Sequence, residues 1–359
     1  MLEIKKIRLC ELDSFLKSEL FCTLDIVPIT PLRAASYLNN PRANPNDVVL
    51  YLGFINQKIV AFRSLFADLA FTGAKTVRFA WCSGSWVRRE YRRKGYSQQL
   101  LAQAFDDWNG KLMLTNYSPA TEKLFQKTGW FAPIHQFQGT RAYLFPKTRK
   151  LLAASQKNGL TRLIASAVDI GIKVYALARL QLFSPTKFSE HRFQELQFPD
   201  KECYEWTQSR KSQALFRRGE AELKWIFKHP WISGHDSRFQ EKYPFSSYSN
   251  EFYYCTIKIF RQNTFAGFFI FSVREGHLKT LHFDVDEKQE AEIAAYLKNY
   301  CVKNKIEMAT IYNSGVAGAL FKQKFPFLRL KKMGQKIYST FSVSGAYSFQ
   351  DGDGDVSFT

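Results

Sequence analysis

One turn of the chain reads Val87-Arg-Arg-Glu-Tyr-Arg-Arg-Lys-Gly-Tyr-Ser-Gln-Gln-Leu-Leu101. The apolar segment 79–87 predicts a strand, and the segment from about Ser97 onward predicts a helix. The turn between them carries Arg92, Arg93, Lys94 and Gly95. Backbone amides at the N-terminus of a helix point outward, and the helix dipole adds partial positive charge there. We therefore expect this basic, glycine-containing turn to hold a phosphate group.

Each feature of the turn has a simpler interpretation when taken alone, because glycine often only forms a turn and basic clusters often only face solvent. The combination is more specific and resembles motif A of the GCN5-related N-acetyltransferase (GNAT) superfamily, Arg/Gln-x-x-Gly-x-Gly/Ala. Residues 92–97 fit this pattern with one departure, Ser97 in the last small position. The resemblance implies that acetyl-CoA is the cofactor and that it is bound by Val87, Arg92, Arg93, Lys94, Gly95, Tyr96 and Ser97.

Length and composition set the broad class. A chain of 359 residues favours two domains, and 45% hydrophobic residues are enough to form sizeable cores. The six cysteines are scattered and the histidines show no ligand spacing, so neither a disulfide framework nor a metal is expected. This cysteine pattern favours the reducing cytoplasm. The formal net charge of +19 would attract anions, from a nucleotide cofactor to nucleic acid.

No signal peptide or transmembrane segment is expected from the sequence. The start of the chain has no long apolar stretch behind its first lysines. The most apolar helical segment, 160–183, is interrupted by Arg162, Asp169, Lys173 and Arg179. Crossing a bilayer takes about 20 mostly apolar residues with few charges. The segment is therefore expected to be an amphipathic connector, and attachment to a membrane surface stays open.

The order of elements in the first part of the chain is that of the GNAT fold. The patterns predict β-α-α-β-β-β-α-β-α followed by two closing strands, 134–138 and 141–145. A helix from Asp13 to about Phe21 is expected after the first strand. Next to the strand 112–115 lies Asn116, followed by a predicted helix, 119–127. This stretch resembles a second GNAT motif, which implies that Asn116 bonds the pantetheine arm of the cofactor. Capping of the following helix by Asn116 is the alternative.

The second part of the chain resembles a repeat of the first. Strands at 251–260, 265–273 and 277–285 and a helix at 287–304 follow in the same order. The turn after Val285 contains three acidic residues and no glycine, and it would repel a pyrophosphate. The predicted fold is α/β (α+β), with two tandem GNAT-like domains that each have a mixed, mostly antiparallel sheet flanked by helices. We expect an active domain at 1–147, a helical linker at 148–189 and a degenerate copy at 190–359.

The resemblance implies direct transfer of an acyl group from the thioester to an acceptor amine. The sequence departs from the family where acid and base are expected, because strand 79–86 has no Glu and Phe125 replaces the usual Tyr. Tyr117 is a candidate acid and His135 a candidate base. The second domain or the acidic segment 351–355 could supply the base instead, although such a segment is often a disordered end.

The sequence predicts an acyl-CoA-dependent N-acyltransferase that acts on a small-molecule amine. An amino sugar is the first candidate acceptor, because segment 217–231 is rich in Arg, Trp and His. An amphipathic helix with its cap explains that segment equally well. Two alternatives remain: a non-catalytic module that binds nucleic acid or another polyanion, and a FemAB-like transferase that uses aminoacyl-tRNA. The oligomeric state is not predicted.

Overall fold

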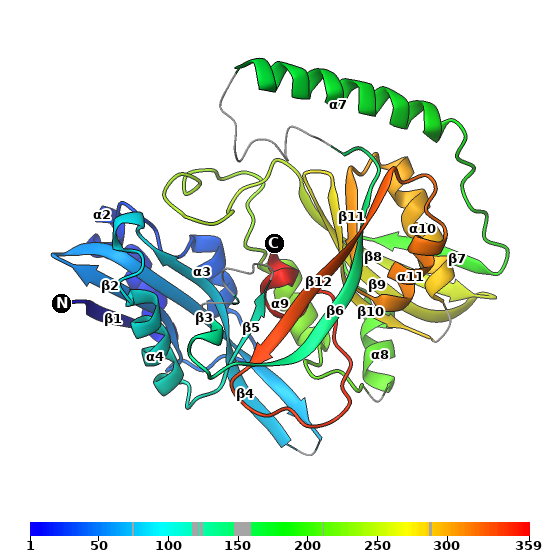
Figure 1. Cartoon of the computed structure of the whole chain (residues 1–359). Coiled ribbons are helices and arrows are strands. Elements are labelled where there is room, and N and C mark those ends of the chain that lie inside the picture. Colours follow the sequence, from blue (N-terminus) through cyan, green and yellow to red (C-terminus); the bar gives the residue numbers. More distant parts are fainter. Residues whose placement is uncertain (74, 117–121, 123–124, 147–158, 211, 287–288) are drawn as a thin grey trace. The chain divides into compact units, whose positions relative to one another are not determined.

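The computed structural model describes residues 1–73, 75–116, 122, 125–146, 159–210, 212–286 and 289–359 (Figure 1). The chain divides into two compact units, each built from separate stretches. Unit 1 comprises Met1–Gln136, Pro199–Phe252 and Gln335–Thr359, and unit 2 comprises Phe137–Phe198 and Tyr253–Gly334. This division differs from the domain boundaries predicted from the sequence, at 147 and 190. The segments Pro199–Phe252 and Gln335–Thr359 pack with the N-terminal residues in unit 1.

The sheet of unit 1 has the strand order β1-β2-β3-β4-β5-β12. Neighbouring strands are antiparallel except for β4 and β5, which are parallel. The strands are β1 Glu3–Arg8, β2 Val48–Ile55, β3 Lys58–Thr72, β4 Lys75–Val87, β5 Leu112–Asn116 and the end of β12 Arg329–Ser339. Long apolar runs in β2 and β3 are explained by burial on both faces of this sheet.

Helices cover both faces of the unit 1 sheet. They are α1 Leu12–Lys17, α2 Glu19–Thr23, α3 Pro31–Leu38, α4 Tyr96–Asp107, α8 Lys201–Ser209 and α9 Glu220–Lys228, with short 3-10 turns η1 Leu9–Glu11, η2 Arg89–Tyr91 and η3 Gly354–Phe358. The single helix expected at 13–21 is wrong, because Ser18 is extended and its hydroxyl caps α2 by accepting from the Phe21 amide at 3.2 Å.

One face of this sheet packs against α4. Leu100, Leu101 and Ala104 of the helix share a core with Ala80 of β4 and Leu112 of β5. These residues recur at the spacing of one helix face, which is why the segment after the basic turn forms a helix here. The N-terminus of α4 follows the end of β4 through the basic turn.

The opposite face packs against aromatic residues that come from late in the sequence. The Phe66 ring of β3 contacts the rings of Trp225, Trp231 and Phe358. All of these side chains are buried. Segment 217–231 is therefore α9 with its flanks and not an exposed aromatic surface. Of the two possibilities left open for segment 351–355, the structure shows the ordered one, because Val356 and Phe358 anchor η3 in this core.

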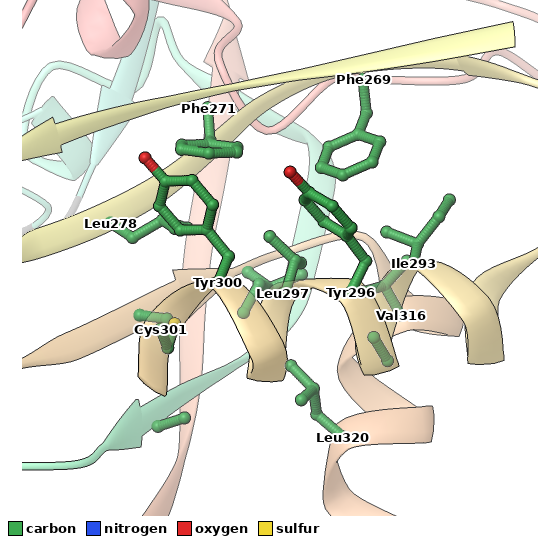
Figure 2. Packing of buried hydrophobic residues seen from close by; sticks show 14 of the residues in the cluster. Phe269, Phe271, Leu278, Ile293, Tyr296, Leu297, Tyr300, Cys301, Val316 and Leu320 are labelled. Carbon is green, nitrogen blue, oxygen red and sulfur yellow. The ribbon is translucent and has the colours of Figure 1, made fainter. Parts of the chain in front are cut away.

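The sheet of unit 2 has the strand order β6-β11-β10-β9-β8-β7, and β10 and β11 are parallel. Its strands are the second half of β6 Ala132–Tyr143, β7 His191–Leu196, β8 Phe252–Arg261, β9 Thr264–Arg274, β10 His277–Val285 and β11 Met308–Ile311. Its helices include α7 Gly159–Leu180, α10 Glu290–Lys303 and α11 Ser314–Lys322. Figure 2 shows Tyr296 and Tyr300 of α10 turned toward Phe269 and Phe271 of β9.

The two closing strands expected at 134–138 and 141–145 are wrong. They form one continuous strand, β6, because Gly139 lies within the strand instead of making a turn. A Cβ atom at Gly139 would lie 2.4 Å from the Ile311 carbonyl oxygen, so glycine allows β6 and β11 to approach closely. β6 and β12 each begin in one unit and end in the other.

The two units repeat one arrangement. In unit 1, α4 connects the parallel strands β4 and β5, and in unit 2, α10 connects the parallel strands β10 and β11. Each sheet is mixed, mostly antiparallel and flanked by helices. The predicted α/β class with two tandem units is therefore confirmed. Within the described residues, none of the helices has both the length and the apolar character needed to cross a membrane.

Candidate functional site

The basic turn of unit 1 has the geometry of an anion site. Gly95 is the residue before α4 and adopts φ +80°, a left-handed conformation that glycine reaches without strain. Its carbonyl oxygen accepts from the amides of Gln98 and Gln99, at 3.1 and 3.0 Å. Because glycine has no side chain to cap the helix, the amides of Tyr96 and Ser97, ahead of these two donors, remain available to a ligand.

Three cationic side chains surround this helix end. Arg92, Arg93 and Lys94 are exposed. The Nε of Arg92 donates to the Val87 carbonyl oxygen at 3.2 Å and holds the start of the loop against the end of β4. The Lys94 ammonium lies 5.0 Å from the centre of the Tyr91 ring. The structure thus brings together all the motif A residues chosen from the sequence, from Val87 to Ser97.

The hydroxyl of Ser97 faces a buried arginine that was not predicted. Arg63 of β3 is 1% exposed, and its Nη2 donates to Ser97 Oγ and to Ser85 Oγ, both at 3.3 Å. Burial lowers the pKa of the Arg63 guanidinium. This contact gives Ser97 a role inside the unit where the family pattern has glycine or alanine. A lone arginine in an apolar strand was the signal that sequence reasoning missed.

The two parallel strands beside this loop diverge. β4 and β5 pair only at Ala80 with Leu112 and at Trp81 with Met113. Beyond these pairs, β4 continues along β3 as far as Val87, while β5 continues along β12. A bulge on β4 lies at the start of the divergence, because Ser83 has no opposite residue in the register between β3 and β4. Such bulges turn a strand away from its neighbour and are common beside active sites.

A carboxylate from the C-terminal segment lies across this divergence. Ser83 Oγ of β4 donates to Asp355 Oδ2 at 2.9 Å, and Thr115 Oγ1 of β5 donates to Asp355 Oδ1 at 3.2 Å. Both donors are two residues beyond the last pair of the parallel ladder. Asp355 is partly buried, and each of its carboxylate oxygens accepts one of these hydrogen bonds. The sequence pointed to segment 351–355 only as an alternative source of a base.

The remaining predicted site residues have different outcomes. Asn116 is the last residue of β5 and pairs with Lys336 of β12. Tyr117 and most of the predicted helix 119–127 lie outside the described residues. The His135 ring is half-buried and stacks on Phe349, with 4.1 Å between ring centres. Burial lowers the pKa of His135. Its role as a base stays a prediction.

A buried ionic cluster supports the face on which Asp355 lies. Asp68 accepts from Arg42 Nη1 at 2.5 Å, from Arg218 Nη2 at 2.9 Å and from Trp81 Nε1 at 2.7 Å. Burial alone would raise the pKa of Asp68, but the two guanidinium groups hold it at about 2. Trp81 belongs to the last pair before the strands diverge, so this cluster fixes the base of the opening.

A second buried carboxylate lies two residues before Asp355. Asp353 Oδ2 accepts from the Gln350 amide at 2.8 Å, whereas its Oδ1 has no hydrogen-bond partner. Burial raises the pKa of Asp353 to about 7, and the nearby Arg218 only partly offsets this effect. Asp353 is therefore protonated over part of the physiological range.

The site suits an anionic cofactor with a long flexible arm. The uncapped start of α4 and its cationic rim fit a pyrophosphate, and the end of the β4–β5 pairing at Trp81 and Met113 suits the approach of an amide-containing chain. In the described ranges, no group of three or more His, Cys, Asp or Glu side chains is placed to hold a metal ion. The fold and the basic turn together suit the binding of an acyl-CoA donor.

Residues 12–130 match the model of the acetyltransferase (GNAT) family. A search of curated protein sequences gives no match.

Two solved structures share the fold across nearly the whole chain. A protein of Enterococcus faecalis described as a probable N-acyltransferase matches with a TM-score of 0.54 and 9% identity, over 94% of this chain and 72% of that one. The N-myristoyltransferase of Saccharomyces cerevisiae, solved with bound myristoyl-CoA, matches with a TM-score of 0.52 and 13% identity, over 94% and 82%. At these identities, the similarity shows the fold alone.

Proposed function

We propose that the chain is an acyl-CoA-dependent N-acyltransferase and that unit 1 binds the acyl donor. The observation that carries this proposal is the position of the Gly95 turn, at the start of α4 and beside the divergence of β4 and β5. The turn would bind the pyrophosphate, and the thioester would lie between the strands. The match of residues 12–130 to the GNAT family supports the same function.

Acetyl-CoA is the proposed donor. The similar yeast structure contains myristoyl-CoA, so the length of the acyl chain needs its own test. Asn116, at the end of β5, is proposed to bond the pantetheine arm of the donor. The acceptor is a small-molecule amine, with an amino sugar as one candidate, and the cytoplasm is the proposed location.

Asp355 is the proposed general base. The donor supplies a thioester carbonyl carbon activated for attack. The amine nitrogen forms a bond to this carbon and the C–S bond breaks, while the Asp355 carboxylate takes the proton that the amine loses. A carboxylate also attracts a protonated amine and positions it near the thioester. Backbone amides of β4 beyond Trp81 are proposed to stabilise the oxyanion.

Tyr117 and His135 remain proposals beside Asp355. Tyr117 follows Asn116 directly and would return a proton to the departing thiolate. His135 is the alternative base, and its lowered pKa keeps the imidazole neutral and able to accept a proton near neutral pH.

Unit 2 is proposed not to bind the donor. Its corresponding helix, α10, has Glu290 and Glu292 in the first turn, and Asp286 ends the preceding strand region. Carboxylates at a helix N-terminus are favourable for the helix but repel a pyrophosphate.

Calorimetric titration with acetyl-CoA and with myristoyl-CoA tests this function. We expect one site per chain in the wild type and loss of that site in Gly95→Glu. Gly73→Glu is the matched control, because Gly73 also has positive φ, at +60°, and open space around it. Absence of binding in the wild type would overturn the acyltransferase function and favour a polyanion-binding module. Equal loss of acetyl-CoA binding in both variants would show that backbone strain causes the loss, and not the position of Gly95 in the basic turn.

A further inference from the structure

Helix α7 of unit 2 turns its apolar side chains toward solvent. The exposed fractions are 65% for Ile170, 61% for Val174 and 57% for Tyr175. Val168 and Leu177 are exposed as well. At about 100° per residue, these positions together with Ala167 and Ala178 cover one broad side of the helix. A helix on the surface of a water-soluble domain normally shows the opposite pattern.

The opposite side of α7 packs on unit 2 and includes Ala176, Arg179 and Leu180. Ala176 is buried, and Leu180 packs against the core of unit 2. The Arg179 guanidinium lies 5.0 Å from the centre of the Phe325 ring, and Asp169 is half-buried. Lys173 is exposed at the edge of the apolar side. The exposed apolar side is therefore the face left over after α7 has packed on its own unit.

The sequence around this helix is strongly basic. Between residues 147 and 179 it contains seven basic residues and one acidic residue, Asp169. The basic residues are Lys147, Arg149, Lys150, Lys157, Arg162, Lys173 and Arg179. An apolar helix face with basic residues is the pattern of helices that lie in the plane of an anionic membrane surface.

Charge decides between the partners that an apolar face can take. A second copy of this chain would bring the same sequence, with seven basic residues and one acidic residue between 147 and 179, and these like charges oppose its approach. An anionic lipid surface neutralises these charges and accepts aliphatic side chains without requiring a matching shape. Among the described residues, no helix meets the requirements for crossing a bilayer, so α7 would lie on the surface.

We propose that α7 docks unit 2 on a membrane surface rich in anionic phospholipids. Val168, Ile170 and Val174 enter the boundary between head groups and acyl chains. Lys173 extends from the edge of the apolar side toward lipid phosphates. The Tyr175 ring, which is apolar with a polar end, suits the same boundary. This inference concerns a surface of unit 2 and does not depend on the acyltransferase function.

Sedimentation with vesicles tests the proposal on the full chain. Vesicles of phosphatidylglycerol and phosphatidylcholine in equal amounts are compared with vesicles of phosphatidylcholine alone. We expect the wild type to sediment with the anionic vesicles and to be released as salt is raised. Val174→Glu should bind at least about tenfold more weakly, because a charge must then be buried at the lipid boundary.

A matched control is Leu38→Glu, which places the same charge on another exposed apolar residue of a helix, α3 of unit 1. This variant should bind vesicles like the wild type. Circular dichroism and thermal unfolding verify that both variants are folded. The proposal is overturned if the wild type does not sediment, if both kinds of vesicle bind it equally or if Val174→Glu binds unchanged. It is also overturned if light scattering shows a dimer that Val174→Glu dissociates, since a second copy would then cover α7.

Discussion

Asp355 accepts a hydrogen bond from Ser83 at 2.9 Å, although the two residues are 272 positions apart in the sequence. The same carboxylate accepts from Thr115 on the neighbouring strand. One acidic side chain from the C-terminal segment thus contacts both strands of the parallel pair just beyond the point where their pairing ends. The proposed acceptor side of the site depends on this contact.

Replacement of this carboxylate should reduce catalysis and leave donor binding intact. For Asp355→Asn we expect kcat/KM to fall by about 10²–10⁴, the usual contribution of a general base. Release of the CoA thiol, measured with a set of primary amines that includes glucosamine, reports the rate. Asp13→Asn, an exposed carboxylate on α1, is the control. Unchanged kcat/KM in Asp355→Asn would exclude it as the base.

Removal of the Ser97 hydroxyl should affect stability more than cofactor binding. In Ser97→Ala, Arg63 loses an acceptor inside the unit, and we expect the free energy of unfolding to fall by about 1–3 kcal/mol. Affinity for acetyl-CoA, measured by calorimetry, should remain within about twofold. A large loss of affinity with unchanged stability would mean that the hydroxyl binds the phosphate directly.

The ionic cluster around Asp68 should be essential for the stability of unit 1. Asp68→Asn removes the counter-charge that Arg218 contacts and one of the two carboxylates that pair with Arg42, the other being Glu222, and we expect a loss of about 3–5 kcal/mol in denaturant unfolding. The comparison is Asp107→Asn, which removes a partly exposed ion pair with Lys6 and should cost about 1 kcal/mol or less. Similar losses of unfolding free energy in the two variants would contradict the view that the buried ion pairs stabilise unit 1 more than the partly exposed one.

Because of Asp353, the free energy of unfolding should decrease as pH rises from mildly acidic to neutral values. Its pKa is raised to about 7 in the folded state, so the protonated form is favoured by folding. The resulting stabilisation is complete below the unfolded pKa of about 3.9 and is lost as pH rises through 7. Asp353→Asn should therefore be more stable than the wild type at pH 8, by roughly 2–4 kcal/mol, with a much smaller difference at pH 4. Thermal unfolding at both pH values measures this, and a difference independent of pH would contradict it.

Gly139 should tolerate no side chain. Gly139→Ala brings a Cβ atom against the Ile311 carbonyl oxygen and the Tyr312 ring, and we expect a loss of about 1–3 kcal/mol. Gly171→Ala is the contrasting change, because Gly171 has open space around it in α7 and alanine favours a helix. It should be neutral or stabilising in the same unfolding experiment. Equal effects of the two changes would argue against the close approach of β6 and β11.

Local features of the fold could be predicted from the sequence. The basic turn, the strand before it and the helix after it depend on neighbouring residues, and they lie where the pattern placed them. The strand at 277–285 also has the predicted limits. Apolar periodicity and turn residues act over short distances, so they are visible in one sequence.

The features that sequence reasoning missed depend on contacts between distant segments. The pairing of β5 with β12 joins Asn116 to Lys336, and no local pattern indicates such a partner. The C-terminal segment looks like a solvated acidic end, but Val356 and Phe358 after it are the apolar residues that anchor it. Arg63 was missed because burial of a charge becomes evident only when its partners on β4 and α4 are known.

β6 and β12 each run from one unit into the other, and this has a consequence for the synthesis of the protein. The ribosome makes β1 to β5 early, yet β5 receives its neighbour β12 only after residue 339 has been added. Until then, the nascent chain has an open strand edge, which can pair with other chains. Unit 1 must therefore wait for nearly the whole of unit 2 to be translated, and a chaperone that shields β5 during this delay would improve the yield of folded protein.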